Sequence, residues 1–332
     1  TSLLQVQGTS NNPVVFQSNK ASPGRSDWTG IELRRPYRDI ESVLRYVTVR
    51  HASTGLKLTA NSSVNAGTIS DLTFEQCTTG AYVDNQPVTL ARITARQVDT
   101  GILVGNCAAV VSGCQVSNSG TLLETGTGIY LANYTGNVVS NTVQGLLFGV
   151  RYTAGGWNYV SQLNTNLIQA NVNGVYFDNG CGASRPVLRG NQIVGNKTWA
   201  VDVISSCDSG SDRVLDATGN WWGTTDPALI AQMIYDRNDN GGAAVVNFAP
   251  YWVTPTGSNS PDNIIEGIYN STLTLALSNS PYRMVGNVIC NGNLVAEPGV
   301  VVQVEPGCQL ICETTSLLQV QGTSNNPVVF QS

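Results

Sequence analysis

The chain has 332 residues, only 12% of them charged, and its formal net charge is −5. This composition argues against a nucleic-acid partner, because proteins that bind the phosphate backbone gather Lys and Arg in clusters. No apolar run reaches the length of a membrane span, so we expect no membrane insertion. Eight cysteines without a CxxC pair favour disulfides in an oxidising compartment over a zinc site. We therefore expect an extracellular or cell-surface protein without a resident cofactor.

The two ends of the chain are identical in sequence. Residues 1–18 read TSLLQVQGTSNNPVVFQS, and residues 315–332 repeat this sequence at an offset of 314 residues. Three explanations are open: the chain is a window onto a tandem array with that period, the duplication is artificial, or a natural terminal copy serves strand exchange between subunits. We take the array as the working interpretation, in which residue 1 is not a biological N-terminus.

A shorter repeat, marked by glycine, runs through the middle of the chain. Glycines recur every 21 to 27 residues from Gly55 to Gly174, and Ala200 continues the row. The residues one and three positions after each of them are apolar and are separated by mostly polar residues, which is typical of a half-buried strand. Because one turn cannot bury its apolar face alone, the recurrence predicts an all-β solenoid, a parallel β-helix with coils of about 21–27 residues.

Asparagine recurs in register with these strands. Asn141, Asn166 and Asn191 each stand two residues before an apolar residue at the start of a turn, Asn220 follows them, and Cys114 takes the matching place one turn earlier. Stacked asparagines at a bend can hydrogen-bond to one another and to the tight backbone. We therefore interpret the row as a ladder rather than as ordinary loop asparagines.

An outward column stands two positions after the glycines and contains Tyr82, Tyr130, Arg151 and Tyr176. Exposed aromatic rings in a row could stack on glycans or on a neighbouring filament, and the alternative is that loops cover them. Sequons for N-glycosylation, which suit a surface protein that carries glycans, occur at Asn61, Asn133, Asn196 and Asn270.

Cysteine spacing predicts two disulfides. Cys181 and Cys207 stand 26 residues apart, one coil length, on loops that follow neighbouring strands, and Cys107 and Cys114 would close one short turn. The spacing assigns no connectivity to the other four, although a Cys290–Cys308 bond is a candidate; these are Cys77, Cys290, Cys308 and Cys312.

Residues 226–236 carry the one good helical pattern. Asp226 can cap the helix, Pro227 suits its first turn, and one face collects Leu229, Ile230, Met233 and Ile234. Just before it, the GNWWG segment holds Trp221 and Trp222. We expect one of these rings to pack on the end of the coil, where no further strand is available to cover the edge.

Directly after this helix, Asp236, Asn238 and Asn240 precede Gly241 in the order of the first half of a calcium loop, D-x-[DN]-x-[DN]-G. Position twelve would be Asn247 in place of the required Glu. The motif therefore predicts at most a weak Ca²⁺ site, and a polar turn after the helix is the alternative.

Four segments resemble secreted and cell-surface right-handed β-helix proteins of the pectate-lyase-like superfamily. GNLVAEPGVVVQVEPG at 292–307 looks like their opening turns, and GTSNNPVVFQSNKASPGRSDWTGIEL at 8–33 looks like their early turns. The coils over 47–203 are similar to their central coils, and GNWWGTTDPALIAQMIYDRNDNGGAAVVNFAPYW at 219–252 looks like their closing coil and tail. The resemblance implies a right-handed β-helix with one short α-helix after the closing coil.

The order of these segments predicts a permuted unit, because opening turns come first in that superfamily yet stand last in this chain. We therefore expect main coils over 1–223, a closing helix and tail over 224–255, a linker over 256–280, and opening coils of the next unit over 281–332. This order agrees with the array interpretation, which rested on the duplication alone.

Carboxylates give no readable catalytic site. Enzymes of the superfamily place carboxylates on adjacent turns of one face, since acid–base cleavage of a glycosidic bond needs two carboxyl groups within roughly 5–9.5 Å. Asp84 and Asp178 share a register but stand four turns apart, and Asp99 and Asp202 are isolated. Glu75 aligns with arginines on both sides and predicts an outward ion-pair ladder. The only histidine, His51, is expected to be an incidental surface residue.

The sequence thus favours a protein that is not an enzyme. We expect a structural subunit of an extracellular filament, sheath or long repetitive adhesin, which binds identical copies of itself head to tail through the open ends of the β-helix. The alternative is a carbohydrate-binding or polysaccharide-cleaving β-helix protein, a lyase or hydrolase, that binds surface glycans on the face from Tyr82 to Tyr176.

Overall fold

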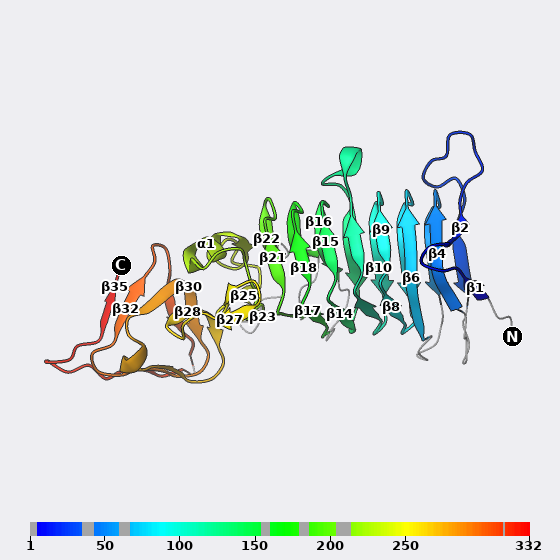
Figure 1. The fold of residues 1–332 in the computed structure, drawn as a ribbon. Coiled ribbons are helices and arrows are strands. Elements are labelled where there is room, and N and C mark those ends of the chain that lie inside the picture. Colours follow the sequence, from blue (N-terminus) through cyan, green and yellow to red (C-terminus); the bar gives the residue numbers. More distant parts are fainter. Residues whose placement is uncertain are drawn as a thin grey trace.

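The computed structural model describes residues 5–34, 43–59, 67–153, 160–178, 186–203, 214–314 and 316–332. It is an all-β solenoid, a right-handed parallel β-helix of about 10 turns with one short α-helix. The coils stack along one axis, so the molecule is elongated and its two termini lie at opposite ends (Figure 1). The fold class predicted from the sequence is confirmed.

Three rows of strands form the walls of the main coil. The first sheet begins with β1 (Gln5–Gln7), β2 (Val14–Phe16), β4 (Val43–Arg50) and β6 (Thr68–Glu75), and it divides at β6. One row continues through β8 (Thr89–Ala91), β11 (Val110–Ser112), β14 (Asn137–Val139), β17 (Gln162–Asn164) and β20 (Val187–Arg189). The other row continues through β9 (Thr94–Arg96), β12 (Gln115–Ser117), β15 (Thr142–Gln144), β18 (Leu167–Gln169) and β21 (Gln192–Val194). A 3₁₀ turn, η1 (Gly120–Leu122), projects between β12 and β13.

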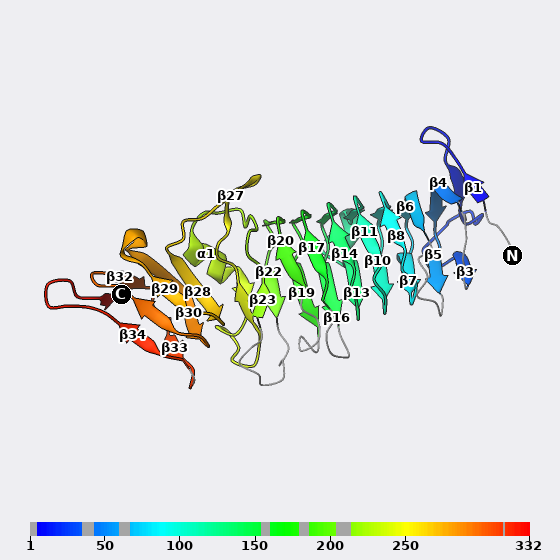
Figure 2. The same ribbon diagram turned by 90° about the horizontal axis from the view of Figure 1, so that it is seen from below.

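The second sheet closes the coil on its remaining side. In the described residues it contains β3 (Ile31–Arg34), β5 (Thr54–Thr59), β7 (Thr79–Asp84), β10 (Thr100–Gly105), β13 (Thr127–Ala132), β16 (Phe148–Thr153), β19 (Asn173–Asp178), β22 (Trp199–Val203) and β24 (Ile234–Tyr235). Figure 2 shows its strands from β7 to β19 side by side along the axis.

The glycines that recur in the sequence lie on successive strands of this second sheet and mark its register. Neighbouring strands pair in parallel, with Leu56 opposite Ala81 and Ala81 opposite Ile102, and these inward side chains are buried. Glycine is required where the coils touch: a Cβ atom on Gly101 would lie 2.6 Å from the carbonyl oxygen of Gly128 and 2.3 Å from a Val116 methyl group. The columns meet in one main hydrophobic core.

The predicted asparagine ladder is present at the bend between the two rows of the first sheet. Each side-chain oxygen accepts a hydrogen bond from the backbone N–H one coil earlier, at 2.8 Å for Asn141 to Cys114 and 2.9 Å for Asn166 to Asn141. Asn191 and Asn220 continue the ladder in the same way. The amide groups thus replace strand pairing where the backbone turns.

The regular coil is interrupted after β22. Here α1 (Pro227–Gln232) begins at Asp226, whose carboxylate accepts a hydrogen bond from the Ala228 N–H at 3.0 Å, and the helix lies between β22 and β30 (Figure 1). The helix ends before the predicted residue 236 because Ile234 joins β24 opposite Val201. Trp222 is 1% exposed and packs in the main core at this break, as expected, whereas Leu229 is 45% exposed.

A second, smaller stack follows the interruption. β23 (Val214–Asp216) pairs with β25 (Val245–Asn247), and β26 (Trp252–Thr254) forms an antiparallel hairpin with β27 (Gly257–Asn259). The stack itself consists of β28 (Ile264–Tyr269), β29 (Leu273–Leu275), β30 (Tyr282–Cys290), β31 (Leu294–Ala296), β32 (Val301–Val304), β33 (Leu310–Cys312), β34 (Leu318–Val320) and β35 (Val329–Gln331), with a 3₁₀ turn η2 (Leu277–Asn279). It encloses its own hydrophobic core.

Part of the expected linker over 256–280 belongs to this second stack. β28 pairs in parallel with β30, and β29 pairs with β31, so the coils begin at residue 264 and not near residue 281. Ile265 and Leu275 are buried in the second core, which explains why the segment folds as strands. The composition of the segment, with its Ser, Asn and Pro residues, concealed this apolar spacing.

Candidate functional site

The two ends of the coil are built from the duplicated sequence. At one end, β1 and β2 both pair with β4 and have no other strand partner among the described residues. At the other end, β34 pairs with β31 and β35 pairs with β32, again on one side only. The first copy is therefore covered by the coil that follows it, and the second copy by the coil that precedes it.

The two copies also share their local conformation. In the first copy the Asn12 N–H donates to Thr9 Oγ1 at 3.0 Å and the Thr9 N–H donates to the Asn12 carbonyl at 3.0 Å. In the second copy Asn326 and Thr323 make the same two hydrogen bonds, at 3.1 and 3.0 Å. A Cβ atom on either equivalent glycine, Gly8 or Gly322, would meet the same backbone nitrogen at 2.8 Å. The shared sequence thus forms one turn in two settings.

Equivalent residues of the two copies differ in whether a neighbouring coil covers them. A Cβ atom on Gly8 would lie 2.4 Å from the Tyr46 carbonyl of the next coil, whereas the three atoms nearest to a Cβ on Gly322 belong to its own turn. Val6 packs against the main core, but the equivalent Val320 is 46% exposed. Phe330 is likewise 41% exposed. The last coil therefore ends in an apolar edge whose sequence is covered, at the other end of the molecule, by β4.

The predicted outer column is in register along the second sheet. Tyr130 stands opposite Arg151, and Arg151 stands opposite Tyr176, while Tyr82 lies two strands before Tyr130. The Arg151 guanidinium lies 5.0 Å from the centre of the Tyr130 ring and 6.0 Å from that of Tyr176, and it forms an ion pair with Asp178. All four column residues are half-buried, so the column is less exposed than the sequence implied, and its cation is already paired.

Asp202, which the sequence analysis treated as an isolated carboxylate, continues this column. It stands opposite Tyr176, is 5% exposed, and its Oδ1 atom has no hydrogen-bond partner. Burial raises the pKa of this carboxyl group to about 6. A carboxyl group with a pKa in this range is a candidate for proton transfer near neutral pH, and the alternation of the strand alone gives no sign of its burial.

A groove of about 470 Å³ lies on the first sheet and is lined by residues that include His51, Arg50, Glu75, Arg96 and Ser119. The Glu75 carboxylate forms an ion pair with Arg50 at 2.7 Å, whereas Arg96 has no ion-pair partner in the described part of the chain. The predicted ladder therefore forms on one side of Glu75 alone. His51 is 6% exposed and its Nε2 atom lies 2.9 Å from Gln76, so it is not the surface residue that we expected.

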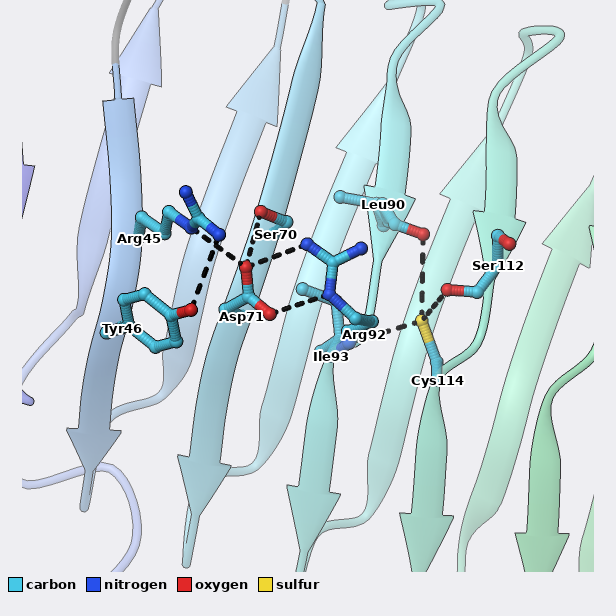
Figure 3. Close-up of polar contacts among 9 residues, drawn as sticks. All are labelled: Arg45, Tyr46, Ser70, Asp71, Leu90, Arg92, Ile93, Ser112 and Cys114. Atoms are coloured by element: carbon cyan, nitrogen blue, oxygen red, sulfur yellow. Dashed lines mark hydrogen bonds and ion pairs between the residues drawn. The ribbon is translucent and has the colours of Figure 1, made fainter. Parts of the chain in front are cut away.

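Next along the same sheet, two arginines converge on one carboxylate (Figure 3). Arg92 donates two hydrogen bonds to Asp71, at 2.7 and 2.8 Å, and Arg45 donates a third at 3.1 Å. The Arg92 guanidinium, with smaller contributions from Ser70 and Arg45, holds the pKa of Asp71 well below its usual range. A carboxylate held in this way stays charged and cannot act as a general acid near neutral pH.

The predicted Cys107–Cys114 disulfide is wrong. Both thiols are free and buried, and the Cys114 thiol donates to the carbonyls of Leu90 and Ser112, as Figure 3 shows. Burial raises the pKa of Cys114 to about 12. The two residues flank β11, and Cys114 occupies the first place of the asparagine ladder, which fixes its side chain inward. The other predicted pair, Cys181 and Cys207, lies outside the described residues.

The predicted glycosylation sites differ in how their amides are used. The side-chain nitrogen of Asn196 donates to the Ile168 carbonyl at 3.1 Å within a second asparagine ladder, and that of Asn133 donates to Asn106 at 2.9 Å. Asn270 is exposed, its oxygen accepts from Asn291 at 2.7 Å, and no hydrogen bond of its side-chain nitrogen is found among the described residues. Asn61 lies outside the described residues. Asn270 is thus the described sequon best placed to carry a glycan.

The calcium motif forms a turn in which the polar side chains accept hydrogen bonds from backbone N–H groups. Asp236 is 3% exposed, and its two oxygens accept from the Asn238 and Val246 N–H groups at 2.8 and 2.9 Å. Asn240 accepts from the Gly242 N–H. Burial raises the pKa of Asp236 to about 6, which disfavours the charge that a Ca²⁺ ligand needs. No cluster of three His, Cys, Asp or Glu residues that could hold a metal ion occurs in the described ranges.

Comparisons with known proteins agree with this architecture. A family model for the right handed beta helix region matches residues 54–212. No curated protein and no solved structure matches the chain. No described helix has the length and apolar character needed to cross a membrane. The sequence match and the coil geometry together show a right-handed β-helix protein.

Proposed function

We propose that this right-handed β-helix protein is a structural subunit of an extracellular filament, sheath or long repetitive adhesin, in which units join head to tail through the ends of the coil. The observation that carries the proposal is the complementary covering of the two copies: among the described residues, the strands in 5–16 pair only with a later coil, and the strands in 318–331 pair only with earlier coils. One segment that occupied both settings would have both of its edges paired.

Such a junction explains the apolar edge at the end of the chain. Unpaired strand edges invite further strands, and a head-to-tail contact that does not close produces a fibre. In the proposed junction Val320 would take the covered position that Val6 holds against the main core. Units continue either covalently, as a tandem array, or by exchange of the shared strands between separate chains.

Intact mass distinguishes these two forms. For denatured and reduced protein from the natural source, the array predicts a polypeptide several times the 35.2 kDa of this chain. A single species at that mass would refute covalent tandem repeats and would leave strand exchange as the form of the filament.

Removal of one copy at a time tests the junction itself. Residues 19–332 keep only the last copy and residues 1–314 only the first, so each variant presents the shared strands at one end and lacks them at the other. We expect both variants to polymerise into fibres. The full chain 1–332, in which its own copies already cover β4 at one end and β31 and β32 at the other, and the variant 19–314, with neither copy, are expected to stay monomeric. Sedimentation velocity and electron microscopy at matched concentrations report the outcome.

A point variant serves as the matched control. Val320→Lys in the 19–332 chain places a charge where the junction buries an apolar side chain, so polymerisation should be lost while the circular dichroism of the coil is kept. The proposal fails if 19–332 and 1–314 both sediment as folded monomers, or if Val320→Lys polymerises as well as its parent.

The groove and Asp202 favour one alternative, a carbohydrate-binding or polysaccharide-cleaving protein. Arg96 lies in the groove and has no ion-pair partner within the described ranges, and Asp202 carries an oxygen beside Tyr176 that has no hydrogen-bond partner there. A reducing-end assay on a panel of acidic polysaccharides tests cleavage, and Asp202→Asn is the variant that should abolish it. Equal product from both proteins would show contamination, and no product from either would remove the polysaccharide-cleaving form of this alternative.

A further inference from the structure

We infer that Cys290 and Cys312, whose thiols are free in this structure, form a disulfide under oxidising conditions that fastens β33 to β30, directly before the second copy of the shared sequence. Cys290 and Cys312 are opposite one another in the parallel pair β30–β33. This inference does not depend on the proposed function, because it rests on the register of two strands and on their thiols.

The register places both thiols on one face of the sheet. In a parallel pair, directly opposite residues point to the same side, and their Cα atoms lie roughly 4.8 Å apart. That spacing is within the range of about 4.4–6.8 Å that disulfides span. The Cys312 side chain is close enough to hydrogen-bond with Cys290, and burial together with this neighbour raises the pKa of the Cys290 thiol to about 11. The register thus brings the two thiols within reach of one another.

Access differs between the two sulfurs in a way that sets the order of reaction. Cys290 is 0% exposed, whereas Cys312 is exposed at the edge of the sheet. The Cys312 thiol, after losing its proton to water, can attack a low-molecular-weight disulfide such as oxidised glutathione and release one glutathione thiolate. Cys290 then loses its proton and attacks Cys312 Sγ, which releases the second glutathione. The cysteine pair loses two electrons, and the oxidant gains them.

The bond would act where the stack is weakest. In the described part of the chain β33 pairs with β30 alone, so it is an edge strand. It also leads, after two further residues, into the segment at 315–332 that ends the coil. A covalent link between β33 and β30 would hold this last coil in register. The third nearby thiol, Cys308, stands in the turn before β33 and has no opposite partner in the strand pairing.

Peptide mapping without reduction tests the inference. The full chain is refolded in a mixture of oxidised and reduced glutathione, quenched with acid, alkylated after denaturation and digested. We expect a linked pair of peptides that joins Cys290 to Cys312, with Cys308 alkylated. The Cys308→Ser variant should keep the linked pair, whereas Cys312→Ser should leave Cys290 fully alkylated. Dithiothreitol should lower the melting temperature of the Cys308→Ser variant more than that of a Cys308→Ser, Cys312→Ser double variant.

Two results would overturn it. Recovery of both Cys290 and Cys312 as alkylated thiols from the oxidised preparation would show that the pair does not form. Linked peptides that contain Cys308 with either partner would show that the turn, and not the strand register, decides the connectivity. Circular dichroism is measured on every variant before the mapping. A Cys312→Ser chain that has lost its fold is thereby recognised and is not counted as evidence about the disulfide.

Discussion

Each ladder asparagine satisfies backbone groups that a bend would otherwise leave unpaired. Asn166 is 2% exposed; its side-chain oxygen accepts from the Asn141 N–H at 2.9 Å, and its nitrogen donates to the Val138 carbonyl at 3.0 Å. Burial keeps water away from these two backbone groups. Leaving one of them unpaired in the core would cost more free energy than the net value of one hydrogen bond. The ladder therefore fixes the spacing of the coils as well as their register.

Asn166→Ala should lower the free energy of unfolding by roughly 2–4 kcal/mol, since it leaves a buried N–H and a buried carbonyl without partners. Urea denaturation measures the change. The matched control is Gln169→Ala at a nearby half-buried position, whose side-chain hydrogen bond to Gln144 is exposed to solvent, and we expect a change within about 0.5 kcal/mol. Equal effects of the two substitutions would contradict a structural role for the ladder.

Sequence spacing revealed one ladder and not the other for a physical reason. Asn141, Asn166 and Asn191 recur at one coil length without a gap, and this regularity is visible in the sequence. The second ladder contains Asn171 and Asn196, whose oxygens accept from the Leu146 and Asn171 N–H groups. Its earlier members are interrupted by residues of other types, so the period is lost. Spacing also misjudged Cys107 and Cys114, because closeness in sequence does not specify the direction of a side chain.

At the scale of elements, side chains bridge the break between the two stacks. Asn247 at the end of β25 accepts from the Ile268 N–H at 3.0 Å and donates to the Ile268 carbonyl at 3.2 Å, as a neighbouring strand would. Glu266 on β28 accepts from the Phe248 and Ala249 N–H groups at 2.8 and 2.9 Å. These contacts attach the second stack to the first without strand pairing, which is why composition alone suggested a linker.

The Glu266 bridge should make stability depend on pH. Burial, opposed by the two backbone hydrogen bonds, raises the pKa of Glu266 from 4.5 to about 8. Between these two pKa values the folded chain holds a proton on Glu266 that the unfolded chain has lost. The contribution of this proton to the free energy of unfolding is therefore complete below pH 4.5 and is lost as pH rises to 8. We expect the free energy of unfolding to fall across this window by about 1 kcal/mol per pH unit.

Glu266→Gln provides the check, because the amide oxygen can accept the same two hydrogen bonds without titrating. Chemical denaturation at pH 5, 6, 7 and 8 should give a flatter profile above pH 6 for this variant. Below pH 6 a slope of the same sign should remain, since burial also raises the pKa of Asp236 and Asp202 to about 6. An unchanged slope between pH 6 and 8 would assign the pH dependence to another group.

Trp222 seals the same break from the side of the main core. Its ring is 1% exposed, so Trp222→Ala should lower the free energy of unfolding by roughly 3–5 kcal/mol through lost contacts and the cavity that remains. Leu229→Ala on the exposed side of α1, where the side chain is 45% exposed, is the control and should change stability by less than about 1 kcal/mol. Thermal melts followed by circular dichroism measure the stability of both variants. Equal losses of stability would contradict the role of Trp222 at the break.

At the scale of the whole molecule, a solenoid gains stability from contacts between neighbouring coils. In a single unit the first and last coils lack one neighbour each, and the copies of the shared sequence occupy these positions. Leu318, Val320 and Phe330 are between 41% and 47% exposed at the last coil. A chain in which residues 1–314 are followed directly by residues 1–332 has one internal copy with coils on both sides, besides the two terminal copies.

Hydrogen exchange on this two-unit chain separates a continuous coil from two linked but independent units. In a continuous coil the backbone amides of the internal copy pair on both sides, so peptides that contain its β34 and β35 strands should exchange at least tenfold more slowly than the same peptides at the C-terminus of the single unit. Small-angle scattering should show the long dimension growing by roughly 50 Å, because each unit adds about 10 turns at roughly 4.8 Å. Val320→Lys introduced at the internal copy alone should restore fast exchange there. If the internal copy exchanges as fast as the terminal ones, the units do not stack, and the duplicated sequence must serve the fold of a single unit instead of the junction between two.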